Sequence, residues 1–205
     1  MTSIVREVIT DKKLTYFASK SELREKTIEE LLQERFAPYI GMTQEQMAEQ
    51  LEVPFNPGNK AFIAKLISSL LGVKGTHLDK IAEFAKANIQ FKTVRLKENG
   101  IPKEHMSFVN IDFKEIVKED WEESYIREYF LETQLLFVVF QFNAKEELIF
   151  KGIKLWHMPM ETIETKLYEY WDAIRKTVSE GVQLQETKRG IKNNLPDAKF
   201  NGVLH

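Results

Sequence analysis

The sequence of 205 residues contains no cysteine. This absence excludes a disulfide scaffold, a thiol nucleophile and any zinc or iron–sulfur site that depends on cysteine ligands. Lack of cysteine also fits a protein that works in a reducing compartment, so we expect a cytoplasmic location.

Long apolar runs are missing as well. The longest extends from Leu135 to Phe140, far short of the roughly 20 residues that a membrane-spanning helix needs. We therefore expect no membrane partner. With 43% hydrophobic and 29% charged residues, the chain can bury a core and does not have the composition of a disordered protein.

The chain has no large excess of charge of one sign, but its charges are unevenly distributed. Lys and Arg total 29 against 31 Asp and Glu, a net charge of −2. From Asn56 to Lys103 nine basic residues accompany three acidic ones, whereas from Glu104 to Glu132 nine acidic residues accompany three basic ones. The basic stretch indicates a phosphate-facing surface. A solvated face with no ligand would have the same composition.

Capping patterns and apolar periodicity predict several helices. Thr27 with Glu30, and Thr43 with Gln46, form capping boxes that mark two helix starts. Apolar residues at helical spacing predict further helices, over residues 62–70, 118–132 and 160–179.

Strands are predicted between these helices. Alternation over residues 89–94 indicates a strand with two different faces, and the apolar run 134–142 indicates a central strand covered on both faces. Residues 147–156 supply another strand, and a last one begins near residue 199. Since no repeat or linker interrupts the chain, we predict one α+β domain over residues 1–205. It would be a mixed β-sheet flanked by helices, with residues 1–20 as a peripheral lead-in.

One group of polar residues could carry chemistry. Glu83, Gln90 and Lys92 form E-x6-Q-x-K, and strand geometry puts Gln90 and Lys92 on the same face. Many nucleases build a magnesium site from the acidic form of this pattern, D-x(n)-E-x-K. Its carboxylates hold the cation that binds phosphate oxygens, while the lysine orients water. By itself the pattern also arises by chance in a charged chain.

The segments around this group give it a context. They are "TQEQMAEQL", "NKAFIAKLISSLLG", "EFAKANIQFKT", "HMSFVNIDF", "WEESYIREYFLETQLLFVVF" and "LWHMP…YWDAIRKTVSEGV". In these segments and in their order, residues 42–204 resemble the MutH and Sau3AI family of GATC-directed DNA endonucleases. The resemblance implies a restriction-endonuclease-like, MutH-like α+β fold and double-stranded DNA containing GATC as the partner.

The resemblance also implies a degenerate active site. Ser68 stands where the family has a glutamate, Glu83 where it has the metal-bridging aspartate, and Gln90 where it has the second metal glutamate. Lys92 is retained, but Tyr129 replaces a further lysine. Because Glu83 is then the single charged oxygen ligand among these positions, we expect no intact catalytic set and no tightly bound magnesium in this domain.

DNA contacts are implied at other positions. Lys60, next to Asn59 at the end of the "FNPGN" loop, stands where the family has a lysine that reaches DNA, and Lys92 belongs to the same basic stretch. Lys188, Arg189 and Lys192 form a second basic cluster in a predicted loop. A plain surface loop explains this second cluster equally well.

These observations predict a non-catalytic, carboxy-terminal domain of a Sau3AI-like type II restriction endonuclease. It would bind DNA as a pseudo-dimer partner or allosteric effector of the parent enzyme's catalytic domain, which would use magnesium to hydrolyse DNA at GATC. Because the chain stops at His205 within a predicted strand, we expect it to be a piece of a larger protein.

Two alternatives remain open. The first is an active nuclease with a variant site that uses Glu83, Lys92 and an unidentified carboxylate from residues 119–123. The second is a protein-interaction domain that has lost DNA binding.

Overall fold

A computed structural model describes residues 14–73, 78–188, 190–197 and 200–203. The chain divides into two compact units. Unit 1 comprises Met1–Glu104 and Gln134–Trp156, and unit 2 comprises His105–Thr133 and His157–His205. Compact units can belong to one domain, so the single domain over residues 1–205 stays a prediction.

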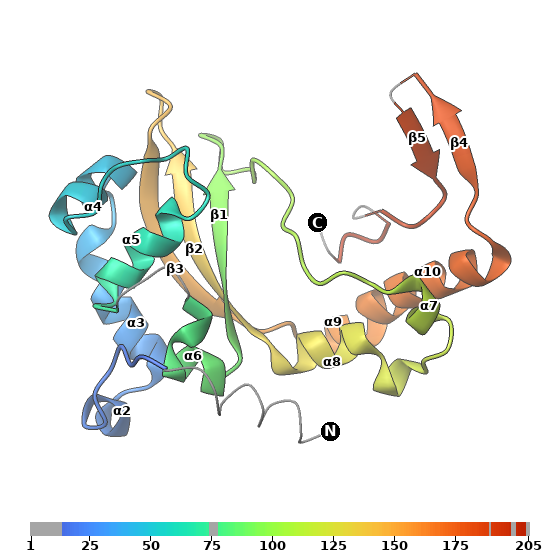
Figure 1. Cartoon of the computed structure of the whole chain (residues 1–205), viewed down its shortest axis with the longest axis horizontal. Coiled ribbons are helices and arrows are strands. Elements are labelled where there is room, and N and C mark those ends of the chain that lie inside the picture. The colour runs from blue at the N-terminus through green and yellow to red at the C-terminus, as the bar shows by residue number, and fades with distance from the viewer. Residues whose placement is uncertain (1–13, 74–77, 189, 198–199, 204–205) are drawn as a thin grey trace. The chain divides into compact units, whose positions relative to one another are not determined.

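Unit 1 contains a three-stranded mixed sheet (Figure 1). The central strand β2 (Gln134–Phe142) pairs in parallel with β1 (Ile89–Leu96) and antiparallel with β3 (Leu148–Trp156). The apolar run of β2 explains its central position, because Leu135 and Leu136 are both buried although they point to opposite faces.

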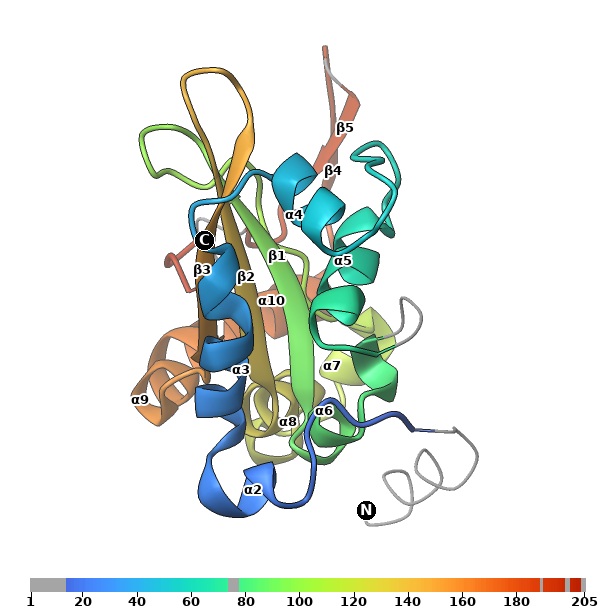
Figure 2. The same ribbon diagram turned by 90° about the vertical axis from the view of Figure 1, so that its left-hand side faces the viewer.

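Helices of unit 1 lie to one side of this sheet or at its end (Figure 2). They are α2 (Glu22–Glu25), α3 (Ile28–Phe36), α4 (Gln44–Gln50), α5 (Phe62–Leu70) and α6 (Ala82–Lys86). The capping boxes predicted at Thr27 and Thr43 both form, which confirms the starts of α3 and α4.

The core of unit 1 lies between these helices and the sheet. Leu66 and Ile67 of α5 are fully buried in the same cluster as Leu136 and Phe140 of β2. Phe150 of β3 packs its ring 5.5 Å from that of Phe140. The mixed sheet with flanking helices confirms the predicted α+β class.

The described part of the lead-in is not peripheral. Thr15 forms a parallel bridge with Ile81, and the Phe17 ring lies 5.8 Å from the ring of Phe84. Phe17 and Ala18 are only 5% and 7% exposed and belong to the core. The prediction for residues 1–20 is therefore wrong at these positions, because an aromatic side chain anchors the segment; residues 1–13 lie outside the described residues.

Unit 2 is built from helices and a hairpin. Its helices are α7 (Phe113–Ile116), α8 (Tyr125–Glu132), α9 (Met160–Thr162) and α10 (Tyr168–Glu180), with a π-helical turn, Ile163–Leu167, between the last two. Strands β4 (Leu184–Thr187) and β5 (Gly190–Asn193) pair antiparallel. The helical run from Met160 to Glu180 matches the predicted long helix.

The prediction of a strand beginning near residue 199 is wrong for the described residues 200–203. Residues 200–203 form bends and a turn, and the Phe200 amide donates to the Asp197 carbonyl across 3.0 Å. Among the described residues, no helix has both the length and the apolar character that crossing a bilayer requires.

Candidate active site and DNA-facing residues

Ser68 lies on α5 and is buried. Its carbonyl accepts a hydrogen bond from the Val73 amide at 2.9 Å, just beyond the end of the helix. A neutral hydroxyl at this position supplies no charge to a cation, unlike the glutamate that the family resemblance would place there.

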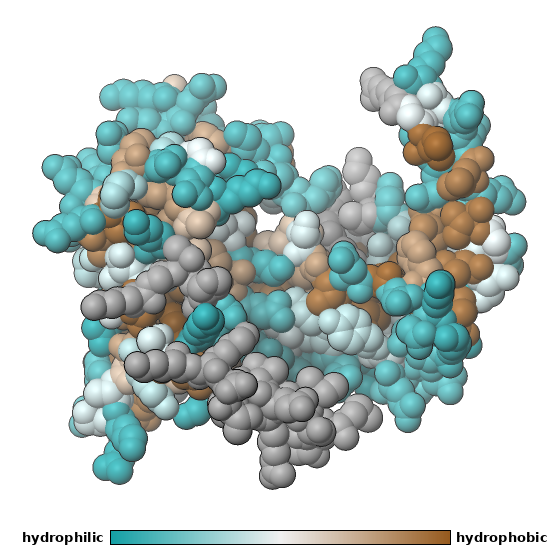
Figure 3. All heavy atoms as spheres, viewed as in Figure 1, coloured by the Kyte–Doolittle hydropathy of each residue, from teal (hydrophilic) through white to brown (hydrophobic). Residues whose placement is uncertain are grey.

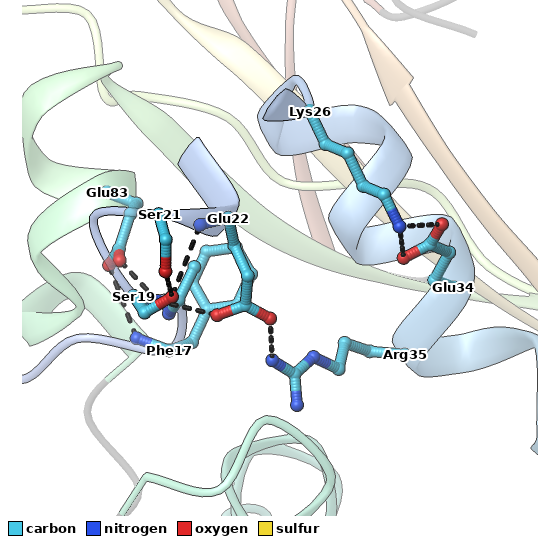
Figure 4. Close-up of polar contacts among 9 residues, drawn as sticks. Phe17, Ser19, Ser21, Glu22, Lys26, Glu34, Arg35 and Glu83 are labelled. Carbon is cyan, nitrogen blue, oxygen red and sulfur yellow. Dashed lines mark hydrogen bonds and ion pairs between the residues drawn. The ribbon is translucent and has the colours of Figure 1, made fainter. Parts of the chain in front are cut away.

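Glu83 lies on α6 and is 5% exposed. Its Oε1 accepts a hydrogen bond from the Ala18 amide at 3.2 Å, and its Oε2 accepts one from the Phe17 amide at 3.4 Å (Figure 4). Both carboxylate oxygens therefore face the backbone of the amino-terminal segment.

Gln90 and Lys92 lie on β1, opposite Leu135 and Phe137 of β2 in the parallel register. The pair between them in the register, Phe91 and Leu136, points to the other face of the sheet and packs on the core of unit 1. Gln90 and Lys92 therefore share the sheet face opposite to the core, as the alternation predicts. Burial lowers the pKa of Lys92, because partial removal from water disfavours the ammonium form.

These residues do not fit a magnesium ion. The cation favours charged oxygen ligands in a strict octahedral arrangement, whereas Glu83 already accepts two amide hydrogen bonds and Gln90 is neutral. Within the described ranges, no group of three or more His, Asp or Glu side chains is placed to hold a metal ion.

Tyr129 belongs to unit 2, whereas the other four predicted active-site positions belong to unit 1. It lies on α8 and is buried, with its ring edge-on to Phe130 at 5.0 Å. Desolvation raises the pKa of Tyr129, and the neighbouring Tyr125 adds to the shift. The phenol is therefore neutral at neutral pH and does not replace the positive charge of a lysine.

Asn59 and Lys60 lie in the exposed loop before α5. The Asn59 Oδ1 accepts a hydrogen bond from the Ala61 amide at 2.9 Å, and the Asn59 carbonyl accepts one from the Phe62 amide at 2.9 Å. Asn59 thus fixes the turn that leads into the helix. Lys60 and Lys65, on the loop and on α5, are exposed.

Other bases of the 56–103 stretch have partners within unit 1. Arg95 donates to both carboxylate oxygens of Glu104, from Nε at 2.6 Å and from Nη2 at 2.5 Å. The Lys103 ammonium lies 4.2 Å from the centre of the Phe142 ring. Because Glu104 neutralises Arg95, the surplus counted over residues 56–103 overstates the charge available to a polyanion.

The late basic cluster lies on a hairpin and not in a plain loop. Lys192 is on β5 opposite Gln185, and Lys188 is in the turn, while Arg189 lies outside the described residues. Leu184 and Ile191 are each 70% exposed and share the other face of the hairpin. Apolar atoms gather over this hairpin in Figure 3. Sequence reasoning missed it because the two strands are only four residues long.

Unit 2 also contains a polar network that the sequence did not indicate. Glu164 accepts a hydrogen bond from Trp121 Nε1 at 2.8 Å and another from Arg127 Nε at 2.9 Å. These bonds, with that of Trp121 the strongest influence, lower the pKa of Glu164.

Glu119 is a second hydrogen-bonded carboxylate of unit 2. Its Oε1 accepts a hydrogen bond from Trp171 Nε1 at 3.0 Å, and its Oε2 accepts one from the Tyr125 amide at 3.2 Å. Glu119 was a candidate for the unidentified carboxylate of a variant nuclease site, and in the structure it holds two donors of its own unit.

Comparison with known proteins identifies the family. The family described as "DNA mismatch repair enzyme MutH" matches residues 76–167. The type II restriction enzyme Sau3AI of Staphylococcus aureus is 34% identical over 225 aligned residues, which cover 100% of this chain and 46% of the relative. The chain thus spans less than half of that relative's length. Together with the α+β fold, these matches confirm the resemblance: the chain belongs to the MutH/Sau3AI family.

Proposed function

We propose that this chain is a non-catalytic, DNA-binding domain of a type II restriction endonuclease that recognises GATC. The observation that supports this most directly is the state of Glu83. It is the one acid retained at the family's metal positions, and it accepts hydrogen bonds from the Phe17 and Ala18 amides.

Phosphodiester hydrolysis in such a site depends on a metal ion that activates water and neutralises charge on the reacting phosphate. Loss of the acids at Ser68 and Gln90 removes the ligands for that ion, and Tyr129 supplies no cation. We therefore assign magnesium and hydrolysis to a separate catalytic domain of the parent enzyme. This domain would bind no magnesium tightly.

DNA binding does not need the metal site. Lys60 and Lys65 are exposed in unit 1, and Lys188 and Lys192 are exposed on the hairpin of unit 2. Each ammonium that reaches a phosphate releases counterions and adds salt-dependent affinity. Phosphate contacts position a protein on the duplex without reading its bases.

A domain of this kind can act as an effector or pseudo-dimer partner of the catalytic domain. Binding of a second GATC site would favour the active arrangement only through a difference in affinity between the inactive and active states. Its partners would then be double-stranded DNA and the catalytic domain of the parent enzyme, in the cytoplasm.

A gel-shift and cleavage assay tests this proposal. The purified chain with a GATC duplex and Mg²⁺ should retard the duplex and leave it uncut. Clean cleavage would contradict the non-catalytic role, and an absence of retardation at low salt would contradict DNA binding.

Replacement of Lys60 tests the DNA contact. Lys60→Ala should weaken binding and lower the slope of log affinity against log salt by about 1. Lys118→Ala is a matched control, because this exposed lysine is paired with Glu115 at 2.9 Å in the acidic stretch. Equal affinities and slopes for the two variants would show that Lys60 is not a phosphate contact.

A protein-interaction domain without DNA binding is the second candidate. The 70% exposure of Leu184 and Ile191 on one face of the hairpin favours it, since contiguous exposed apolar surface often marks a protein partner. The shift assay at low and moderate salt separates the two functions, because DNA binding should weaken steeply with salt.

A further inference from the structure

The segment Thr15–Ser19, called here the amino-terminal strap, lies beside the element that carries Glu83 (Figure 4). The Thr15 amide donates to the Lys80 carbonyl at 3.0 Å, and the Ala82 amide donates to the Thr15 carbonyl at 2.7 Å. The strap therefore pairs with the backbone immediately before Glu83.

Side-chain packing holds the middle of the strap. Phe17 is buried, with its ring 5.8 Å from that of Phe84, the residue after Glu83. The Phe17 and Ala18 amides are thereby brought to the two oxygens of the carboxylate. Buried N–H groups need an acceptor, and a carboxylate is a strong one.

The far end of the strap is also fixed. The Ser19 amide donates to Glu22 Oε2 at 2.8 Å, and the Glu22 amide donates to Ser19 Oγ at 3.2 Å. Glu22 in turn accepts from Arg35 Nη2 of α3 at 2.8 Å. The strap is thus tied to unit 1 on both sides of Phe17 and Ala18.

We infer that the amino-terminal strap has taken the place of a cation as the partner of Glu83. Two backbone N–H dipoles supply the positive end that the carboxylate needs, and the strap covers both oxygens. A divalent cation and the strap then compete for the same oxygens, so the strap closes this position to metal. This inference concerns Glu83 alone and does not depend on DNA binding.

The strap and its competition with cations can be tested by NMR of the full ¹⁵N-labelled chain. In the wild type, the Phe17 and Ala18 amides should exchange slowly with solvent. Glu83→Ala should accelerate their exchange at least tenfold more than that of the Phe150 amide, a core amide bonded to the Met42 carbonyl. Glu25→Ala, which removes an exposed acid of α2, should leave the exchange rates of the Phe17 and Ala18 amides unchanged. Fast exchange of the two amides in the wild type, or no selective effect of Glu83→Ala, overturns the inference.

Broadening of amide signals by paramagnetic Mn²⁺ measures whether a cation can reach the Glu83 carboxylate. In the wild type, the Phe84 and Ala85 amides should broaden no more than that of Phe150. Ala18→Pro removes one of the two donors, so these amides should then broaden as much as those flanking exposed acids. Adding Glu83→Gln to that variant should abolish the broadening.

Strong broadening of the Phe84 and Ala85 amides in the wild type would contradict exclusion of the cation. A folded Ala18→Pro variant in which these amides do not broaden would contradict it as well. If Ala18→Pro does not fold, the exchange measurements on Glu83→Ala decide the inference. Glu83→Ala should retain the DNA shift, so failure of this inference and failure of the proposed function are separately visible.

Discussion

Units 1 and 2 each hold a carboxylate between two donors, but in different surroundings. Glu83 of unit 1 is buried, and among the described residues its partners are two neutral backbone amides. Glu164 of unit 2 is more exposed and accepts from an indole and a guanidinium. Loss of the Glu83 carboxylate leaves two buried amide donors without an acceptor, whereas loss of Glu164 leaves one buried indole and one guanidinium that is 22% exposed and can be hydrated. The same side-chain type therefore contributes very differently to the two units.

The largest effect is expected at Glu83. Glu83→Ala should lower the free energy of unfolding by about 3 kcal/mol, because buried donors without an acceptor cost about 1–3 kcal/mol each. Glu83→Gln retains one acceptor oxygen and should cost less. Urea unfolding of both variants measures the difference, and an alanine variant as stable as the wild type would abolish the contrast with unit 2.

A smaller effect is expected at Trp121. Trp121→Phe removes the Nε1–H group that donates to Glu164 while keeping an aromatic ring against Trp171, whose ring centre lies 5.5 Å away. The expected loss is about 1 kcal/mol, the usual net value of one such hydrogen bond. A loss larger than that of Glu83→Ala in the same urea series would reverse the comparison.

The smallest effect is the pH dependence that Glu164 contributes. Its pKa is lowered in the folded state, so its stabilising contribution is complete above the unfolded value, about 4.3. The contribution is lost as the pH falls from there through the lowered folded value. Glu164→Gln should therefore flatten the acid limb of the stability curve below about pH 4.3 and leave the curve shape near pH 7 unchanged. Superimposable acid limbs for the wild type and the variant would show that Glu164 does not contribute there.

Local patterns predicted the elements whose causes are local. The capping boxes at Thr27 and Thr43 form because each joins residues three positions apart, and the central position of β2 follows from its own apolar run. Non-local partners were beyond reach of the sequence. The Ala18 amide and Glu83 are 65 residues apart, and Trp121 and Glu164 are 43 apart. No spacing rule connects such pairs.

The candidate site divides in the same way. Alternation placed Gln90 and Lys92 on one face of β1, and residue type alone shows that Gln90 carries no charge. That Glu83 would turn its carboxylate toward the amino-terminal strap depends on tertiary packing, which also made the lead-in part of the core. The short hairpin and the bends over residues 200–203 lack the regular alternation that identifies longer strands.

The parallel pairing of β1 with β2 has a consequence for the order in which the chain folds. Residues 97–133 separate the two strands, and most of them belong to unit 2. The sheet of unit 1 is therefore complete only after this intervening stretch has been made and its ends have been brought together. Closing such a loop costs entropy before any pairing repays it, and parallel strands with distant partners form slowly. During synthesis, β1 is made before its partner β2, and until β2 emerges its unpaired edges expose the nascent chain to aggregation.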